Sequence, residues 1–239
     1  TARLQSVRAE HASDWLAVYD TAAAPWLSNS EFRTACCLRL GLPVCPANAV
    51  CDMCGSAVDA EGHHMLACIR GKHAVHGPLR NTLHSLCAQA LLPAVREGMP
   101  FAAQGEAVSH MRMDIVVSAG PDERPLLIDV GVTSPFVHPD LAARAPGAAA
   151  TAYEAVKWRT YGHAVQPQVH NFAPVIADSL GAWGGSAMET LSFLASAYAQ
   201  RRAEAHGDTW RGKAMFFATL SLTLQRHLAR VATRWHILT

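Results

Sequence analysis

Two short apolar runs separated by a polar segment stand out in the hydrophobic pattern between residues 112 and 133. The first run reads R-M-D-I-V-V and the second L-L-I-D-V-G-V-T, and the segment between them is S-A-G-P-D-E-R-P. Runs rich in Ile and Val that are bounded by Gly, Pro, Ser and Asp are typical of β-strands joined by turns. The pattern therefore predicts a β-hairpin with a long loop, or two neighbouring strands.

Each predicted strand carries one aspartate in otherwise apolar surroundings, Asp114 in the first and Asp129 in the second. A single aspartate in a strand more often faces solvent or caps a turn. A matched pair is different, because burying carboxylates is costly unless a positive partner meets them. Oxygen ligands suit Mg²⁺, so the two side chains form a candidate site for a divalent cation.

Helical spacing of apolar residues predicts helices on both sides of this hairpin. One helix begins at Ser30, which reads as its N-cap, and ends at Gly41. Residues 93–105, which contain Pro and Gly, read as a connection. A strand is predicted at residues 169–180, and Pro174 within it indicates a sheet edge or a bulge. Further helices are predicted at residues 76–92, 151–161, 186–198 and 213–235.

Four potential metal ligands precede the hairpin, in the segments C-D-M-C-G and G-H-H-M-L-A-C. Cys51 and Cys54 form a C-x₂-C turn whose thiolates can bind one ion, while His64 and Cys68 stand one helical turn apart. His63 is an alternative ligand to His64. The C-x₂-C-x₉-H-x₃-C spacing predicts a closed tetrahedral Zn²⁺ site rather than a coincidence in a cysteine-rich segment. With seven cysteines and no secretory pattern, thiols and metal are expected rather than disulfides.

Composition narrows the class of protein. Half of the 239 residues are hydrophobic and 16% are charged, which is enough apolar material for one large domain, or one domain with a small appendage. The formal net charge of +1 gives no bulk attraction to nucleic acid, so any DNA site must be local. Without a long apolar run or a cleavable signal pattern, no membrane partner is expected. The first residue is Thr, so we expect a piece of a longer protein.

Lysine is scarce in this chain, with three residues, whereas arginine is common. Lys157 and Tyr161 lie four apart, on one face of a predicted helix. Because arginine is the usual basic residue in this chain, a lysine at position 157 favours a chemical role, such as orienting a water. The alternative is that Lys157 is a surface residue and that the scarcity of lysine reflects a composition bias. Arg80 contacts either phosphate or solvent. Glu106 is either a third carboxylate near the metal or part of a loop surface.

In their order along the chain, these motifs resemble the C-terminal region of non-LTR retrotransposon proteins that carry a restriction-enzyme-like endonuclease of the PD-(D/E)xK class. Those proteins have a Cys-Cys-His-Cys zinc knuckle, then a helical linker, then the nuclease. The matching segments, which together extend over nearly the whole chain, are L-R-L-G-L-P, C-D-M-C-G with G-H-H-M-L-A-C, R-M-D-I-V-V, L-L-I-D-V-G-V-T-S-P, A-Y-E-A-V-K-W-R-T-Y and F-A-P-V-I-A-D-S-L-G-A-W.

Three positions depart from the family's usual pattern. Met113 stands where the family usually has proline, Gly131 occupies the lysine position of the D-x-K tripeptide, and His63 stands where an acidic residue is common. The family is similar to this chain in moving the lysine onto the following helix, here Lys157. No reverse-transcriptase motif is present, so the resemblance implies a fragment or a solitary domain.

The fold implied by the resemblance is α/β (mixed α+β). It has a restriction-endonuclease-like core, in which a small mixed sheet is flanked by helices, and an N-terminal helical and zinc-knuckle segment. The implied boundary separates residues 1–92 from residues 93–239.

The resemblance also implies a catalytic site with a metal ion. Asp114, Asp129 and the backbone carbonyl of Val130 would hold Mg²⁺ or Mn²⁺. The implied catalytic residues are these two aspartates with Lys157 and Tyr161, and Glu106 is a weaker candidate for a contact through water. Zn²⁺ would occupy the knuckle.

The implied activity is the nicking of target DNA, which primes reverse transcription in the parent element. Arg80, Arg112 and Arg159 would contact nucleic acid. The implied partners are double-stranded DNA, element RNA and the reverse-transcriptase domain of the same polyprotein, and the implied place of action is the nucleus, after synthesis in the cytoplasm. Two other classes stay open, namely a zinc-stabilised nucleic-acid-binding module with an inactive nuclease fold, and an assembly domain of a polyprotein.

Overall fold

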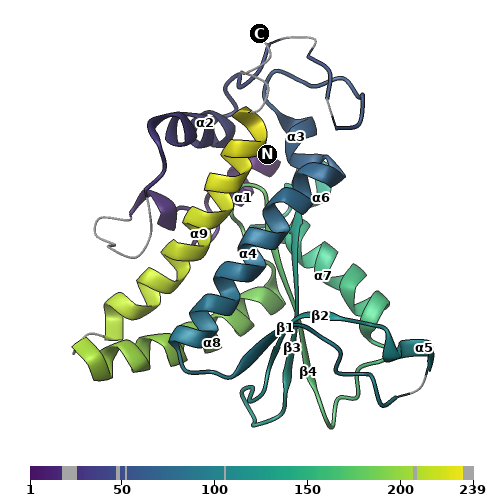
Figure 1. The fold of residues 1–239 in the computed structure, drawn as a ribbon. Coiled ribbons are helices and arrows are strands. Elements are labelled where there is room, and N and C mark those ends of the chain that lie inside the picture. The colour runs from purple at the N-terminus through teal and green to yellow at the C-terminus, as the bar shows by residue number, and fades with distance from the viewer. Residues whose placement is uncertain (18–25, 47–48, 52, 105, 207–208, 234–239) are drawn as a thin grey trace.

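A four-stranded mixed sheet with helices around it forms the centre of the computed structural model (Figure 1). The strands β1 to β4 lie in chain order across the sheet; β1, β2 and β3 pair antiparallel, whereas β3 and β4 pair parallel. This confirms the predicted mixed α/β class and the small mixed sheet. The strands are β1 (Ala94–Gly98), β2 (Met113–Val117), β3 (Leu126–Thr133) and β4 (Asn171–Asp178). The structure describes residues 1–17, 26–46, 49–51, 53–104, 106–206 and 209–233.

The helices that surround the sheet range from single turns to the long α8 and α9. In chain order they are α1 (Ala2–Val7), the 3₁₀ turn η1 (Asp14–Leu16), α2 (Asn29–Leu40), α3 (His63–Ala67), α4 (Ile69–Gln89), α5 (Glu106–Ser109), α6 (Pro139–Ala142), α7 (Ala148–Tyr161), α8 (Gly185–His206) and α9 (Thr209–Thr233).

The predicted hairpin is confirmed by the pairing of β2 with β3, in which Ile115 lies opposite Ile128. Asp114 directly precedes the first of these isoleucines, and Asp129 directly follows the second. In an antiparallel pair these two positions are neighbours across the strands. The hairpin therefore brings the two aspartates side by side. The strand predicted around Pro174 is also confirmed, since β4 forms an edge of the sheet.

Helices cover both faces of this sheet (Figure 1). On one face, the apolar side chains of α4, α8 and α9 share the largest core with residues such as Ile115 and Ile128. On the other face, α7 packs over β3 and β4, where Tyr161 lies against a smaller cluster that contains Leu127 and Phe172. All of β3 except Thr133 is buried, because the strand is covered on both faces, and such strands read as continuous apolar runs.

Two predictions on local structure are wrong. β1 lies within residues 93–105, which read as a connection; it is an edge strand whose side chains are mostly exposed, so it lacks an apolar run. The N-cap of α2 is Ser28 rather than Ser30, because Ser28 and Glu31 form a capping box. The predicted end of that helix at Gly41 is confirmed by its left-handed φ of +73°.

Four other helices begin before their predicted start: α7 by three residues and α8 by one, and α4 and α9 by more. α4 begins at Ile69 instead of residue 76, directly after Cys68. α9 begins at Thr209 instead of residue 213 and is described as far as Thr233. The last two residues of the predicted helix lie outside the described part of the chain.

The predicted boundary after residue 92 falls between α4 and β1. The largest apolar core extends across it, since this core contains Leu38 and Leu83 from the first segment together with Ile128 and Leu220 from the second. The helical segment and the sheet segment therefore share one apolar core.

Candidate functional site

Four predicted metal ligands come together at the start of α4. The ligand atoms of Cys51, Cys54, His64 and Cys68 all lie within 4.8 Å of one another. The Cys54 Sγ lies 3.2 Å from the His64 Nε2. Three thiols and one imidazole at this spacing match a tetrahedral Zn²⁺ site. The prediction that these residues converge is confirmed, and the cluster is able to hold one zinc ion.

His63 is not a member of this cluster. Its ring centroid lies 4.0 Å from that of Phe136, and its Nε2 lies 2.8 Å from the Arg3 Nη2. The two alternatives that the sequence left open are therefore decided in favour of His64.

Short-range contacts shape the knuckle around the four ligands. Gly55, at φ +74°, closes the turn between the first two cysteines. The Asp59 carboxylate accepts hydrogen bonds from the backbone N–H groups of His63 and His64, each at 2.8 Å, and so fixes the first turn of α3. Cys68 ends α3 and is the N-cap residue of α4. The metal cluster therefore adjoins a helix that reaches the sheet.

The thiols of the cluster differ in acidity. Hydrogen bonds with Ser56 lower the pKa of the exposed Cys54 thiol to about 6. Burial raises the pKa of Cys51 to about 11. Cys54 is thus a thiolate at neutral pH, which is the form that binds metal.

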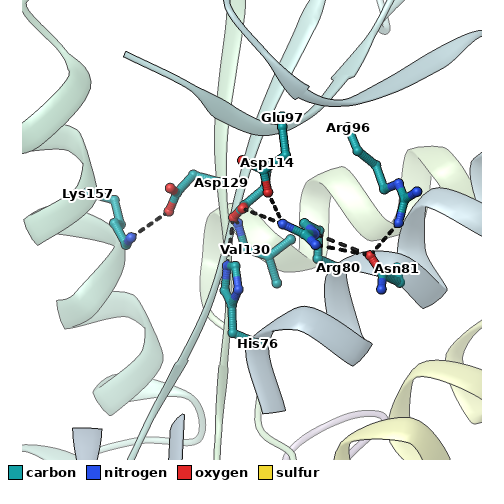
Figure 2. Close-up of polar contacts among 9 residues, drawn as sticks. All are labelled: His76, Arg80, Asn81, Arg96, Glu97, Asp114, Asp129, Val130 and Lys157. Atoms are coloured by element: carbon teal, nitrogen blue, oxygen red, sulfur yellow. Dashed lines mark hydrogen bonds and ion pairs between the residues drawn. The ribbon is translucent and has the colours of Figure 1, made fainter. Parts of the chain in front are cut away.

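Asp129 on β3 and Lys157 on α7 form an ion pair beneath the surface (Figure 2). The Lys157 Nζ lies 2.8 Å from the Asp129 Oδ2, and the two side chains are 20% and 6% exposed. That carboxylate oxygen has no well-aligned hydrogen-bond donor in the described residues. Lys157 is therefore the positive partner of this buried carboxylate. A carboxylate oxygen is also a type of ligand that divalent cations prefer.

Both members of this pair have shifted acidity. Burial raises the pKa of Asp129, attraction to Lys157 opposes the rise, and repulsion from Asp114 adds to it, with a net upward shift. Burial lowers the pKa of Lys157, but attraction to Asp129 outweighs it and the net shift is upward. Lys157 is therefore a cation at neutral pH and not a general base.

Asp114 is held by groups from two elements. Its Oδ2 accepts a hydrogen bond from the Val130 N–H at 2.8 Å and lies 2.9 Å from the His76 Nε2. Its Oδ1 lies 4.0 Å from the Arg80 Nη1. Figure 2 shows Asp129 directed towards α7 and the Asp114 carboxylate directed towards α4. Each aspartate therefore has a protein cation or imidazole as its partner.

Tyr161, one turn after Lys157, joins the same group of side chains. Burial and the nearby charge of Asp129 raise the pKa of its hydroxyl to about 12. Its ring packs against Phe172, with centroids 5.6 Å apart. The tyrosine is thus a neutral group that supports the aspartate–lysine pair.

Gly131 lies two residues after Asp129, at a point where β3 packs closely against β4 and α7. A Cβ atom at this position would lie 2.6 Å from the Ile176 Cδ1 and 3.3 Å from the Tyr153 Cε1. A side chain at this position would have to displace Ile176 or Tyr153. Lys157 reaches Asp129 from α7 instead.

Three other predicted residues are on the surface. Glu106 is exposed at the start of α5 and makes no ion pair with the described residues. Arg112 is exposed directly before β2. Arg159 is exposed two residues after Lys157, which places it on the opposite side of α7. Neither Glu106 nor Arg159 contacts the aspartates in the described structure, and the predicted roles of all three stay predictions.

Four residues near Asp114 were missed as site residues. His76 lies four positions before Arg80, so their shared helix face was a signal in the sequence. Arg96 and Glu97 gave no signal, because β1 has no apolar run. Asn81 gave none because its contact with Arg96 arises only where β1 meets α4. Arg80 pairs with Glu97, whose φ of +53° is unusual for a residue other than glycine. His76 thus contacts Asp114 directly, and Arg80 links this aspartate to Asn81 and Glu97.

Two further observations concern the chain as a whole. Among the described residues, no helix has both the length and the apolar character needed to cross a membrane. Comparison with protein-family models and with curated proteins finds no match for this chain.

Proposed function

We propose that this chain is a metal-dependent DNA endonuclease of the restriction-enzyme-like class, and that it nicks double-stranded DNA. The Asp129–Lys157 ion pair beside Asp114 carries the proposal. Two carboxylates and one ammonium group from neighbouring elements are the groups that metal-assisted phosphodiester hydrolysis uses. The mixed sheet and the order of the sequence motifs also support it.

The residues that would hold Mg²⁺ or Mn²⁺ are Asp114, Asp129 and, through its carbonyl, Val130. When bound, such an ion polarises a phosphate oxygen and makes a coordinated water more acidic. Lys157 is positively charged, so it offsets the negative charge that develops on the phosphate and orients the attacking water. Tyr161 keeps the aspartate and the lysine in place.

The zinc knuckle has a structural role in this proposal. The ligands Cys51, Cys54, His64 and Cys68 would hold Zn²⁺. The ion would cross-link the chain segment that precedes α4. In an element of the kind that the motifs resemble, the nick primes reverse transcription. The partners would then be target DNA, element RNA and a reverse-transcriptase domain, and the place of action the nucleus.

Nicking of supercoiled plasmid in the presence of Mg²⁺ tests the proposal. We expect Asp129→Asn and Lys157→Ala each to slow nicking by about 100-fold or more, since each removes a group that acts on the transition state. Asp140→Asn on α6 and Lys213→Ala on α9 change the same charges at exposed positions, and they should nick like the wild type. Equal rates in all these proteins would end the catalytic assignment.

A second candidate is a zinc-stabilised nucleic-acid-binding module with an inactive nuclease fold. It is favoured by the directions of the aspartates, because Asp129 contacts Lys157 on α7 whereas Asp114 contacts His76 on α4 (Figure 2). The same plasmid assay, run beside a gel-shift assay, separates the two candidates. DNA binding without Mg²⁺-dependent nicking in the wild type identifies the binding module.

A further inference from the structure

Two arginines from different elements meet at one side-chain oxygen near the aspartates. The Asn81 Oδ1 accepts a hydrogen bond from the Arg96 Nη1 at 2.8 Å. It also accepts from the Nε and Nη2 of Arg80, both at 3.3 Å. Arg80 and Asn81 belong to α4 and Arg96 belongs to β1, as Figure 2 shows. The Asn81 amide oxygen therefore holds both guanidinium groups in place beside one another.

The two arginines differ in whether a nearby carboxylate neutralises their positive charge. Arg80 pairs with Glu97 and lies 4.0 Å from the Asp114 Oδ1. Arg96 is exposed, and within the described residues it forms no ion pair; its hydrogen bond goes to the neutral amide of Asn81. A guanidinium group that is held in place by an amide and is not neutralised is ready to bind an anionic ligand.

We propose that Arg96, positioned by Asn81, binds a backbone phosphate of DNA on the β1 side of the two carboxylates. The inference rests on the proposed function. Lys157 lies on α7, over the other face of the sheet from α4, so the contact that Arg96 would make with DNA is separate from Lys157 (Figure 2). The guanidinium fork suits phosphate oxygens, which it can contact through two N–H groups. In a chain with a net charge of +1, such local cations decide where DNA attaches.

A purely structural role is the alternative for Arg96, since its hydrogen bond to Asn81 ties β1 to α4. β1 is already paired with β2 along its length through Ala94, Val95 and Gly98. Loss of the arginine would then change stability slightly and DNA binding not at all. A readout that depends on phosphate contacts separates the two roles, because each contact releases counterions and adds to the salt dependence of binding.

The test is fluorescence anisotropy of a labelled DNA duplex, titrated with the 239-residue chain without divalent cations over a range of NaCl concentrations. We expect Arg96→Ala to bind roughly tenfold more weakly, and its plot of log affinity against log salt to lose about 0.9 of its slope. Arg96→Gln, which keeps a hydrogen-bonding side chain, should lose the same slope. Asn81→Ala keeps the charge, so its affinity falls and its slope is retained. Arg33→Ala, which removes an exposed arginine of α2 far from β1, should match the wild type (Figure 1).

Wild-type affinity and slope in both Arg96 variants would overturn the inference, and so would an equal loss in Arg33→Ala or a wild type that does not bind the duplex. Thermal unfolding of each variant, measured alongside, separates a binding defect from a folding defect. The outcome is independent of catalysis. Failure of the proposed nuclease function shows as absent nicking in the plasmid assay, whereas failure of this inference shows in the metal-free binding assay.

Discussion

At the scale of single residues, the distance between Asp129 and Lys157 depends on the small size of Gly131. Asp129 and Gly131 are two apart on β3, so they share one face of the strand. The missing side chain lets α7 approach β3, because any Cβ there would meet Ile176 and Tyr153. The glycine thus affects the position of α7, and of Lys157 on it, through packing alone.

We expect Gly131→Ala to lower the free energy of unfolding by about 1–3 kcal/mol, because the added methyl group overpacks the contact between β3 and α7. Its nicking rate should fall as well, since the helix that carries Lys157 must move. Gly77→Ala is the matched control on α4, where a Cβ meets no atom within 4 Å. Urea denaturation of the two variants checks the prediction, and equal stabilities would contradict it.

At the scale of elements, Glu154 links α7 to α8. Its side chain, on α7, is buried, with the residue 4% exposed. The carboxylate accepts hydrogen bonds from the N–H groups of Ala187 at 2.8 Å and Ser186 at 3.2 Å, so it caps the first turn of α8. Gly184 leaves room for this carboxylate. Since Lys157 follows on the next turn of α7, the cap holds the helix that serves the site.

The contribution of Glu154 to stability should fall as pH rises. Burial raises the pKa of Glu154 above its ordinary value, and the N–H donors of α8 only partly oppose this. The folded state then keeps the proton at pH values where the unfolded state has lost it. The stabilisation is full below the unfolded pKa and is lost as pH rises through the folded pKa.

Glu154→Gln removes this titration and keeps one acceptor oxygen. The free energy of unfolding of the wild type, minus that of Glu154→Gln, should decrease as pH rises above the ordinary carboxyl range and then become constant. Urea denaturation of both proteins across this pH range measures the difference. A difference that is constant throughout, or that increases, would show that burial does not raise the pKa of this group.

At the scale of the whole molecule, α4 connects the metal cluster to the aspartates. It begins directly after the ligand Cys68, packs against the sheet and α9, and brings His76 to Asp114. Order at the N-terminal end of this helix is therefore expected to affect the sheet and the candidate active site. Apolar residues of the knuckle, such as Val58, Met65 and Leu66, belong to the largest core, so metal binding and folding are expected to be coupled there.

We expect purified protein to contain one zinc ion, and Cys68→Ser to lose it. The loss should lower the Tm by roughly 10 °C, because a few kcal/mol of metal-binding free energy correspond to about 2–4 °C each in a chain of this size. Cys36→Ser, which changes a half-buried thiol outside the cluster, is the control. Metal analysis and calorimetry check the prediction, which fails if Cys68→Ser binds no zinc yet unfolds at the wild-type temperature.

Local patterns in the sequence determined much of this protein. The β2–β3 hairpin with its two aspartates, the C-terminal α7 turn with Lys157 and Tyr161, and the four converging zinc ligands were all predicted from residues close in the chain. Such features depend on short-range periodicity and spacing, which a sequence displays directly. The choice between His63 and His64 could not be read from the local sequence. The two residues are neighbours in the chain, and only tertiary packing decides which of them faces the cysteines.

Only the tertiary structure decided what surrounds the aspartates. β1 was missed because an exposed edge strand has no apolar run, and with it Arg96 and Glu97 were missed as well. The contact of His76 with Asp114 joins residues 38 positions apart, so it exists only because α4 packs across the sheet. Contacts of this kind arise from the burial of apolar faces against one another, and no local pattern records which faces will meet.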